Sequence, residues 1–494
     1  MKKRVVVIGG GIAGLSAGVY AQKSGFDVTI LESHSIAGGN CTAWKRKGYL
    51  FEGGMHWLTG SAKKEPIYRM WKHIGALTDD TVVHYSEPLK EYYYNGQMLN
   101  MYRDIDKTEA HWIAISPEDE KPIRELCNSA RKVQKLIMPI MDISGVKVTK
   151  KNRPSLKVLF DVTSANRSMR KASKIPKEEY FKRFKHEGLR ELFGYLTTNK
   201  YSATWLFFSM ANKARGDGGF PEGGSLPFVG RTVKTFKDAG GKIVFNTCAD
   251  RVITENGRTV GVEAGETTYP ADAVIVTADA MQIEHLFDTQ PKAAWLDELR
   301  AKALPTMCVL VSLGVDADLT KYAKNCTFKL DQPLTVGTFS HPFVTVNNYA
   351  NDPSFSPEGK AAVTLILLSD SYDFWKKAKD EGRYETEKDK AAARVIEALS
   401  KKMPEIEGKV EVYDVATPLT YERYCANWKG SWMTMMAHTM RVRVYPPKVD
   451  NLENVYFAGH RMRAPGGLPV AAMSGRNAVQ YLCRDTKTLF VSEE

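Results

Sequence analysis

The sequence predicts an α/β fold, α+β over the whole chain, with a discontinuous Rossmann-like domain and a mixed-sheet domain with helical cover. Three stretches carry this prediction: a strand–turn–helix–strand unit at the N-terminus, a run of short strands near residue 250, and a strand, glycine-rich loop and helix near the C-terminus. A chain of 494 residues is also too long for one compact core. We therefore expect a Rossmann-like domain of residues 1–75, 214–282 and 448–494, and a second domain of residues 76–213 and 283–447.

The N-terminal stretch Arg4–Glu32 has the pattern of a phosphate-binding unit. Val5–Ile8 is a short apolar, β-branched run, as expected of a buried parallel strand, and glycines follow it at GxGxxG spacing. Gly9 permits a tight turn, Gly11 lets the backbone approach a pyrophosphate, and Gly14 lets helix and strand pack closely. The helix that begins here offers free N–H groups and the positive end of its dipole to phosphates.

Glu32 ends a second apolar strand, Val28–Leu31, where a carboxylate can accept hydrogen bonds from the ribose hydroxyls of a dinucleotide. An acid at this position favours an unphosphorylated ribose, as in FAD or NAD, over that of NADP. A signal peptide is disfavoured, because three consecutive glycines interrupt the apolar run and no small-residue cleavage site follows.

Two glycine pairs follow this unit. Gly38–Gly39 closes the turn after the second strand, and a further strand, Tyr49–Phe51, leads into the loop EGGMHW at residues 52–57. Paired glycines in such a loop predict that the backbone lies against something flat or bulky. A flavin ring is one candidate, and a plain tight turn is the alternative.

The middle of the chain is expected to return to the first domain. A turn-rich loop at residues 218–224 leads into a predicted helix, Leu226–Ala239. Strands are expected at Lys242–Asn246, Asp250–Thr254 and Ala273–Thr277.

The C-terminal block has the same order of elements as the N-terminal one. A predicted strand, Asn454–Ala458, runs into a glycine-rich loop, and a helix is expected over Val470–Cys483. The start of this helix again presents N–H groups to an anion or to a flavin carbonyl.

Residues 122–213 are predicted to be mainly helical and basic, with helices at Ile123–Met138, Leu156–Ser173 and Glu187–Leu196. Between Lys147 and Arg190, 14 Lys and Arg stand against 4 Asp and Glu, a local excess of 10 in a chain of net charge +12. A solvated helical face is one interpretation, and contact with an anionic membrane surface is another. No nucleic-acid-binding motif accompanies the charge, so nucleic acid is not an expected partner.

Two aromatic segments have two interpretations each. Tyr201–Met210 fits the core of the helical region, with a greasy pocket as the alternative. Thr417–Met440, rich in Trp, Tyr and Met, is likewise expected to be core rather than pocket. The strands expected at Cys308–Val315 and Ala362–Leu368 are placed to face a cavity.

Cysteine usage and hydropathy exclude several classes of protein. The seven cysteines are scattered without CxxC pairs, which argues against a metal site or a disulfide framework and fits a reducing cytoplasm. No apolar run reaches the length of roughly 20 residues that a membrane-spanning helix needs. A cytoplasmic protein, in contact with a membrane surface if the basic segment binds one, is expected.

Three blocks together resemble the phytoene desaturase family of FAD-dependent oxidoreductases, which have a two-dinucleotide fold. In chain order they are GGGIAGL…E…AGGN, then FPEGGS…GGKIVFN…DRVI…GRTVGV…ADAVIVTAD, then NVYFAGH…PGGLPVAAMSGRNA. Asn40, where the family usually has Arg, and the following GYLFEGGMHWLTG are similar to carotenoid isomerases and all-trans-retinol 13,14-reductases (retinol saturases). DPSFSPEGKA at Asp352–Ala361 and TPLTYERY at Thr417–Tyr424 are similar to the same branch.

The resemblance implies an FAD-dependent enzyme that transfers hydride between flavin N5 and the C–C bonds of a hydrophobic polyene or isoprenoid. Desaturation, saturation and isomerisation all remain open. For a saturation, His56 is the candidate proton donor; a structural histidine beside the cofactor is the alternative. Val252 is implied to contact the adenine through its backbone. The full set of implied FAD contacts is Gly9, Gly11, Ile12, Ala13, Gly14, Glu32, Ser33, Gly38, Gly39, Asn40, Gly54, Met55, His56, Val252, Gly459, Gly467 and Leu468.

Two other functions compete with this one. An amine oxidase or protoporphyrinogen oxidase-type flavoenzyme is mildly disfavoured by Asn40 and by the similarity at Asp352–Ala361. A flavin-free escort for prenylated proteins predicts a degraded phosphate loop, whereas the N-terminal glycines and the C-terminal PGG loop are present. The expected partner is a hydrophobic small molecule, with no particular oligomeric state predicted.

Overall fold

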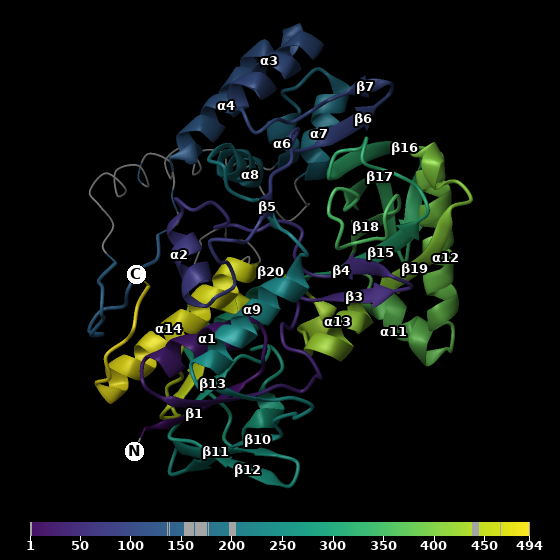
Figure 1. Cartoon of the computed structure of the whole chain (residues 1–494). Coiled ribbons are helices and arrows are strands. Elements are labelled where there is room, and N and C mark those ends of the chain that lie inside the picture. The colour runs from purple at the N-terminus through teal and green to yellow at the C-terminus, as the bar shows by residue number, and fades with distance from the viewer. Residues whose placement is uncertain are drawn as a thin grey trace.

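A five-stranded parallel sheet lies in the lower half of the molecule as drawn in Figure 1. The computed structural model describes residues 2–135, 137, 139–152, 163, 175, 177–196, 204–436, 444–464 and 466–493. Neighbouring strands of the sheet are all parallel, and their order is β21-β13-β1-β2-β9. The strands are β1 (Arg4–Ile8), β2 (Asp27–Leu31), β9 (Lys242–Val244), β13 (Ala273–Val276) and β21 (Val455–Phe457). One sheet thus combines three distant parts of the chain, and the predicted Rossmann-like fold is confirmed.

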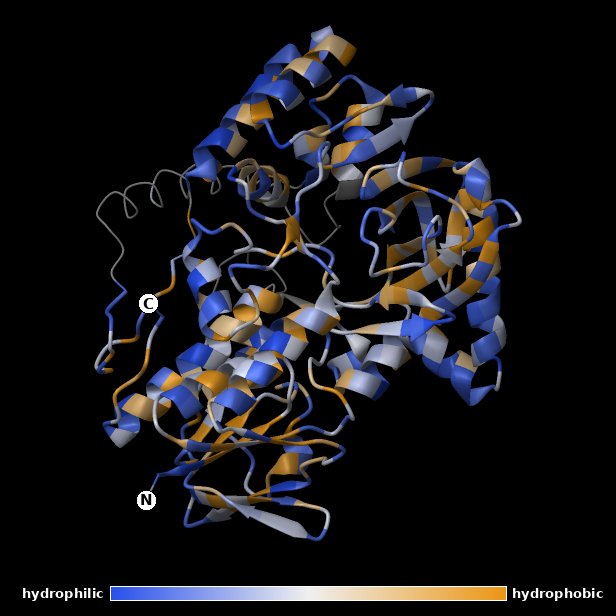
Figure 2. Ribbon diagram, in the orientation of Figure 1, coloured by the Kyte–Doolittle hydropathy of each residue, from blue (hydrophilic) through white to orange (hydrophobic). Residues whose placement is uncertain are grey.

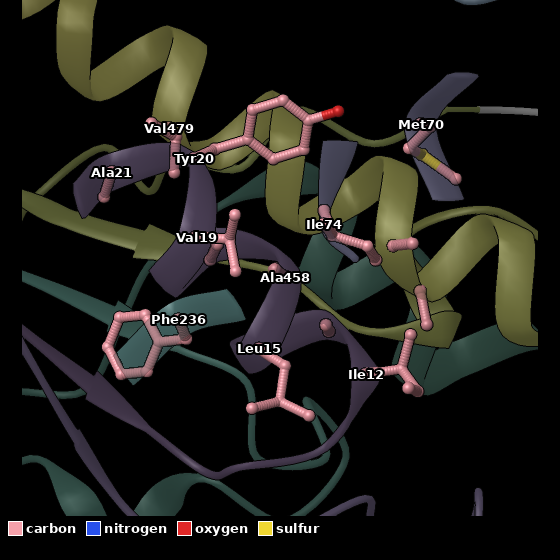
Figure 3. Close-up of a cluster of buried hydrophobic side chains, with 14 of the residues drawn as sticks. Ile12, Leu15, Val19, Tyr20, Ala21, Met70, Ile74, Phe236, Ala458 and Val479 are labelled. Carbon is pink, nitrogen blue, oxygen red and sulfur yellow. The ribbon is translucent and has the colours of Figure 1, made fainter. Parts of the chain in front are cut away.

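Three helices cover this sheet: α1 (Ile12–Lys23), α9 (Ser225–Asp238) and α14 (Leu468–Thr486). At Gly475 of α14, a Cβ atom would lie 2.3 Å from the carbonyl oxygen of Ala13, so the two helices meet at a point that has no room for a side chain. These helices and the sheet enclose a hydrophobic cluster, to which α2 (Pro66–His73) also contributes side chains. Figure 3 shows its side chains, among them Ile12, Leu15, Val19, Tyr20, Met70, Ile74, Phe236 and Val479.

A small antiparallel sheet lies beside the parallel one. It consists of β10 (Arg251–Glu255), β11 (Arg258–Ala264) and β12 (Thr267–Pro270). An Asn256–Gly257 turn joins the first two strands, and both residues have positive φ, as Asn-Gly hairpin turns require.

A seven-stranded mixed sheet forms the second large layer, in the order β19-β15-β18-β17-β16-β6-β7. β6 joins β16 in parallel, and the other neighbours are antiparallel. The helices α11 (Tyr372–Asp380) and α12 (Tyr384–Ser400) contribute to its core. The strands are β6 (Glu91–Tyr94), β7 (Gln97–Met98), β15 (Cys308–Val315), β16 (Asn325–Val336), β17 (Phe339–Asn348), β18 (Ala361–Leu368) and β19 (Val410–Ala416).

A helical layer covers one end of the molecule, drawn at the top of Figure 1. Its helices pack around Trp112, Phe184, Phe193 and Phe207. The predicted helix Leu156–Ser173 and the first residues of Tyr201–Met210 lie outside the described residues. The helices of the layer are α3 (Ile105–Ile115), α4 (Glu120–Gln134), α6 (Lys177–Phe181), α7 (Glu187–Leu196) and α8 (Thr204–Ala214).

Figure 2 shows apolar residues concentrated on the strands of both large sheets. Short elements connect the layers. Short strand pairs are β3 (Ala43–Arg46) with β4 (Tyr49–Glu52), β5 (Val83–His84) with β8 (Phe220–Pro221), and β14 (Ala303–Thr306) with β20 (Met433–Met436). The remaining helices are α10 (Ala294–Lys302) and α13 (Pro418–Cys425), with 3₁₀ turns at Pro117–Asp119, Glu284–Leu286, Pro404–Ile406, Trp428–Gly430 and His460–Met462.

Two expectations from composition can be compared with the structure. All seven cysteines are free thiols. Within the described ranges, none of the helices combines the length and the apolar character needed to cross a bilayer. The domain boundaries given above stay a prediction.

Candidate active site

A cavity of about 1400 Å³ opens where the carboxyl ends of the parallel strands face the second layer. Ligands of open α/β sheets bind at this edge. Of the 17 residues implied to contact a dinucleotide, three do not line the cavity: Gly14, Met55 and Val252. The residues that do line it are Gly9, Gly11, Ile12, Ala13, Glu32, Ser33, Gly38, Gly39, Asn40, Gly54, His56, Gly459, Gly467 and Leu468.

The turn from β1 to α1 has the geometry of a phosphate-binding loop, and we call it the glycine cradle. Gly9 has φ +99°, and a Cβ atom there would lie 2.8 Å from Thr277 Oγ1. A Cβ atom on Gly14 would lie 1.9 Å from the carbonyl oxygen of Gly9, so this glycine serves helix packing. Gly11 caps α1 without a side chain, which leaves the first N–H groups of the helix open to the cavity.

Glu32 lies at the carboxyl end of β2 and is held by the backbone. Its two carboxylate oxygens accept hydrogen bonds from the N–H of Gly10 (2.7 Å) and the N–H of His34 (2.8 Å). These bonds fix the side chain at the cavity wall, where its remaining lone pairs can accept hydrogen bonds from ribose hydroxyls.

The structure does not bring Val252 to the cavity. This residue is buried in β10, opposite Val262. In this part of the chain, the residues that line the cavity are Thr247, Cys248 and Ala249. These residues follow the end of β9, so the rule that ligands lie beyond the carboxyl ends of parallel strands was the signal that could have found them.

The loop after β4 lies against the protein itself. A Cβ atom on Gly54 would lie 1.8 Å from the carbonyl oxygen of Asn40, and one on Gly53 would lie 2.4 Å from the Trp44 ring. Protein atoms therefore account for both glycines without a flavin ring. The buried Glu52 organises the loop by accepting hydrogen bonds from the N–H of Gly54 (3.0 Å), the N–H of Met55 (2.9 Å) and both the N–H and the hydroxyl of Ser225.

His56 belongs to a polar cluster that sequence reasoning found only in part. Its Nδ1 lies 2.8 Å from the Tyr349 hydroxyl, and Lys324 Nζ sits over the rings of Phe220 (3.6 Å) and Tyr349 (4.1 Å). Burial, with repulsion from Lys324, lowers the pKa of His56 to about 3. Burial also lowers the pKa of Lys324 to about 7. His56 is therefore neutral near pH 7, whereas Lys324 changes charge there.

The C-terminal loop closes the other side of the cavity. Gly459, Gly466 and Gly467 all have positive φ, and the N–H of Gly459 donates to Ser474 Oγ at 2.8 Å. Both ring nitrogens of His460 are buried, and neither has a hydrogen-bond partner in the part of the chain that the structure describes. A bound dinucleotide offers the hydroxyl and carbonyl groups that such orphaned atoms need, so the site fits one.

Apolar side chains from several parts of the chain line the cavity away from the glycine turn. The segment Thr417–Met440 contributes to the lining, which corrects the expectation that it is only core. Asn427 in this segment donates from Nδ2 to Asn40 Oδ1 at 2.8 Å and so joins the two sides of the cavity. Apolar lining residues include Leu89, Met101, Ile140, Leu206, Phe208, Ile366 and Met433.

The comparisons with known proteins agree with this geometry. Residues 12–483 match the family model described as flavin containing amine oxidoreductase. Among curated relatives, the all-trans-retinol 13,14-reductase of Danio rerio is 23% identical over 86% of this chain and 76% of its own length. The phytoene desaturase of Fusarium fujikuroi is 25% identical over 98% of this chain and 90% of its own length. The chloroplastic prolycopene isomerase of Arabidopsis thaliana is 23% identical over 95% of this chain and 81% of its own length.

Solved structures show the same fold at lower identity. An oxidoreductase from Methanosarcina mazei superposes with a TM-score of 0.62 at 18% identity, covering 97% of this chain and all of that one. A putrescine oxidase superposes with a TM-score of 0.62 at 13% identity, covering 98% of this chain and 99% of that one. The matched family spans nearly the whole chain, and the glycine cradle, Glu32 and the C-terminal loop fit its cofactor. The chain therefore belongs to the flavin-containing amine oxidoreductase family and is an FAD-dependent oxidoreductase.

Proposed function

We propose that this enzyme acts on C–C double bonds of a hydrophobic polyene or isoprenoid, by desaturation, saturation or isomerisation. The observation that carries the proposal is the shape of the cavity, which continues from the glycine cradle of β1 and α1 to apolar walls at Leu89, Leu206 and Phe208. The names of the curated relatives, a retinol reductase, a phytoene desaturase and a prolycopene isomerase, support the same substrate class.

The chain supplies binding, orientation and a dry site for this reaction, and FAD, when bound, supplies hydride acceptance and donation. We expect the amide groups at the start of α1 to hold the pyrophosphate and Glu32 to hold the adenosine ribose. The C-terminal glycine loop is expected to lie along the rest of the cofactor. The residues in these roles are Gly9, Gly11, Ile12, Ala13, Glu32, Gly38, Gly39, Gly459, Gly467 and Leu468.

A saturation also needs a proton, and His56 stands where it can provide one. Because His56 is neutral, it can give only its single ring proton, and the Tyr349 hydroxyl, 2.8 Å from His56 Nδ1, can pass on a replacement only as it receives a proton itself. Burial raises the pKa of Tyr349 well above its usual value, so its hydroxyl stays protonated. Lys324 beside the two rings is the group that can take up a proton from solvent near pH 7.

The electrostatics of the cavity disfavour an amine oxidase. Lys90, Arg103, Lys213 and Lys324 all line it, and they would repel a protonated amine. An escort protein without flavin is disfavoured by the intact glycine cradle. A protoporphyrinogen oxidase is not excluded by charge, so it enters the test below.

The test is anaerobic photoreduction of the purified holoenzyme, followed by mixing with polyenes, enones, protoporphyrin and oxygen in a stopped-flow spectrometer. For a saturation, we expect the flavin absorbance of the reduced enzyme to return with a conjugated polyene or enone; for a desaturation, we expect a polyene to bleach the oxidised enzyme; for an isomerisation, we expect the reduced enzyme to change the geometry of the polyene without reoxidation. Conversely, bleaching of the oxidised enzyme by a primary amine or by protoporphyrinogen, with no response to any polyene, would replace this proposal by the corresponding alternative.

We also propose that the basic segment Lys147–Arg190 contacts an anionic membrane surface, from which a hydrophobic substrate could enter. Its charge excess supports this proposal. Sedimentation with vesicles containing 30% phosphatidylserine, compared with vesicles of phosphatidylcholine alone, tests it; equal binding to both would reject it.

A further inference from the structure

One face of α13 lines the cavity, although this helix lies outside the three sequence blocks from which the Rossmann-like domain was predicted. Tyr421, Tyr424 and Cys425 are spaced three and four residues apart, so they share one face of the helix, and all three line the cavity. Burial, with repulsion from the Glu32 carboxylate, raises the pKa of the Cys425 thiol to about 12. This face of α13 is therefore within electrostatic range of Glu32.

The Tyr424 ring lies beside the turn that follows β2. Its centre is 5.0 Å from the centre of the His34 ring. The N–H of His34 donates to the Glu32 carboxylate at 2.8 Å, and the N–H of Thr247 donates to the carbonyl oxygen of Glu32 at 2.9 Å. Glu32, Thr247 and Tyr424 all line the cavity, and we call the part that they form the Glu32 end.

Hydrogen bonds on both sides of Tyr424 fix this part of the chain against the dinucleotide side of the cavity. Before it, the Tyr421 hydroxyl donates to the carbonyl oxygen of Gly53 at 3.0 Å. After it, Asn427 Nδ2 donates to Asn40 Oδ1 at 2.8 Å. The ring is thus held in place at the Glu32 end by contacts that do not involve the ring itself.

The Tyr424 side chain still has surface to offer. The residue is 46% exposed, whereas Tyr421 on the same face of α13 is 5% exposed. The Arg423 guanidinium lies 5.0 Å from the centre of the Tyr424 ring, and His34 is its other neighbour named above. Covering an exposed aromatic ring with a flat apolar surface is favourable, because apolar area leaves water and two π-systems come into contact.

We propose that Tyr424 is part of an adenine site, so that the adenosine half of FAD lies at the Glu32 end with its base packed against the Tyr424 ring. Aromatic side chains bind nucleobases through their flat faces without needing a particular hydrogen bond. The inference rests on the proposed placement of the adenosine ribose on Glu32, and it does not depend on the substrate. It makes α13 a cofactor-binding element in addition to the three sequence blocks.

The test divides FAD into its two halves. Full-length apo-protein, prepared by removing FAD from the holoenzyme, is titrated by calorimetry with ADP, which carries the adenosine half, and with FMN, which carries the flavin half. The variants are Tyr424→Ala and Tyr424→Phe. Tyr413→Ala is the matched control, because Tyr413 on β19 is 43% exposed and is not among the described residues that line the cavity. Release of FAD from the diluted holoenzyme, followed by flavin fluorescence, is the second measurement.

We expect Tyr424→Ala to bind ADP and FAD at least about tenfold more weakly and to release FAD faster by a similar factor, with FMN affinity unchanged. Tyr424→Phe and Tyr413→Ala should keep the wild-type values, because the ring of residue 424 makes the contact. An unchanged ADP affinity in Tyr424→Ala, an equal loss for ADP and FMN, or the same loss in Tyr424→Phe or Tyr413→Ala would overturn the inference. If ADP binds too weakly to titrate, the FAD release rates decide in the same way.

The outcomes also separate this inference from the proposed function. If a polyene reacts with the holoenzyme while ADP binds equally to the wild type and to Tyr424→Ala, the proposed function stands and the adenine site falls. If Tyr424→Ala selectively loses ADP affinity while an amine, and no polyene, reacts with the holoenzyme, the adenine site stands and the proposed function falls.

Discussion

Gly11 and Gly14 belong to one motif but have different structural roles. A Cβ atom on Gly11 would have no atom of the described chain closer than 3.9 Å, whereas one on Gly14 would overlap the carbonyl oxygen of Gly9 at 1.9 Å. The first glycine therefore leaves room on the cavity side, and the second allows the turn and the helix to pack. The sequence motif predicted both roles, because each depends on atoms close by in the chain.

We expect Gly11→Val to lose FAD while keeping a folded apo-protein, because the new side chain occupies the cradle. Gly14→Ala is expected to destabilise the protein by about 1–3 kcal/mol or more through overpacking. The ratio of flavin to protein absorbance and the unfolding midpoint of the apo-protein check the pair. Retention of FAD by Gly11→Val would contradict the placement of the pyrophosphate.

The His56 cluster yields a second prediction at this scale. Tyr349→Phe and His56→Ala should keep their FAD but reoxidise more slowly with an enone, by about 10²-fold for His56→Ala if it donates the proton. The rate is measured by stopped flow as a function of pH.

The pH profile distinguishes the groups of this cluster. Because the pKa of His56 is about 3, its removal should leave any inflection near pH 7 in place, whereas Lys324→Met should remove it. A wild-type rate in His56→Ala would assign that histidine a structural role.

At the scale of elements, local sequence patterns predicted the bounds of several helices and strands, whereas amino-acid composition did not distinguish the core from the cavity lining. The predicted bounds of Cys308–Val315 and Glu187–Leu196 match β15 and α7. By contrast, the aromatic segment Thr417–Met440 was expected to be core, and it lines the cavity. Core and apolar pocket use the same side chains, so composition cannot separate them.

The crossing of α1 and α14 gives a prediction for an element contact. Gly475→Val should push the two helices apart and cost about 1–3 kcal/mol, because its Cβ would meet Ala13 O at 2.3 Å. Gly230→Ala on α9, where no atom lies within 4 Å of the added Cβ, should instead stabilise by about 0.5–1 kcal/mol. Denaturant unfolding measures both; a similar change in both variants would contradict the packing argument.

At the scale of the whole molecule, the cavity collects groups that no local pattern connects. Lys90 and Arg103, which are close in sequence, line it together with Lys213, which follows more than a hundred residues later. The sequence predicted the parallel sheet from three separate blocks, because each carries its own strand and glycine signals. It could not predict that these basic residues line one cavity, since a lone lysine has no signature before the chain folds.

These buried lysines also predict how stability varies with pH. Lys90, Lys213 and Lys324 have pKa values lowered to about 7, 8 and 7, whereas unfolded lysine titrates near 10.4. For these lysines the unfolded chain binds more protons than the folded chain, so they make stability rise with pH from about 7. Six of the seven thiols, whose pKa burial raises to about 12, act in the opposite direction once unfolded thiols ionise near pH 8.5. The unfolding midpoint of the enzyme should therefore rise by about 1 °C from pH 7 to 8, and less in Lys213→Met. A falling midpoint in the wild type, or the same rise in the variant, would contradict the charge assignment.

The order of strands in the parallel sheet has a consequence for biosynthesis. The central strand β1 is made first, but its neighbour β13 and the edge strand β21 follow some 270 and 450 residues later, and α14, which packs on α1, comes after them. At about 5–20 residues per second, translation leaves the first βαβ unit without its partners for tens of seconds. A nascent chain therefore exposes apolar surface on β1 and α1 until β21 and α14 have been made, and the glycine loop at residues 459–467 joins the site only at that late stage.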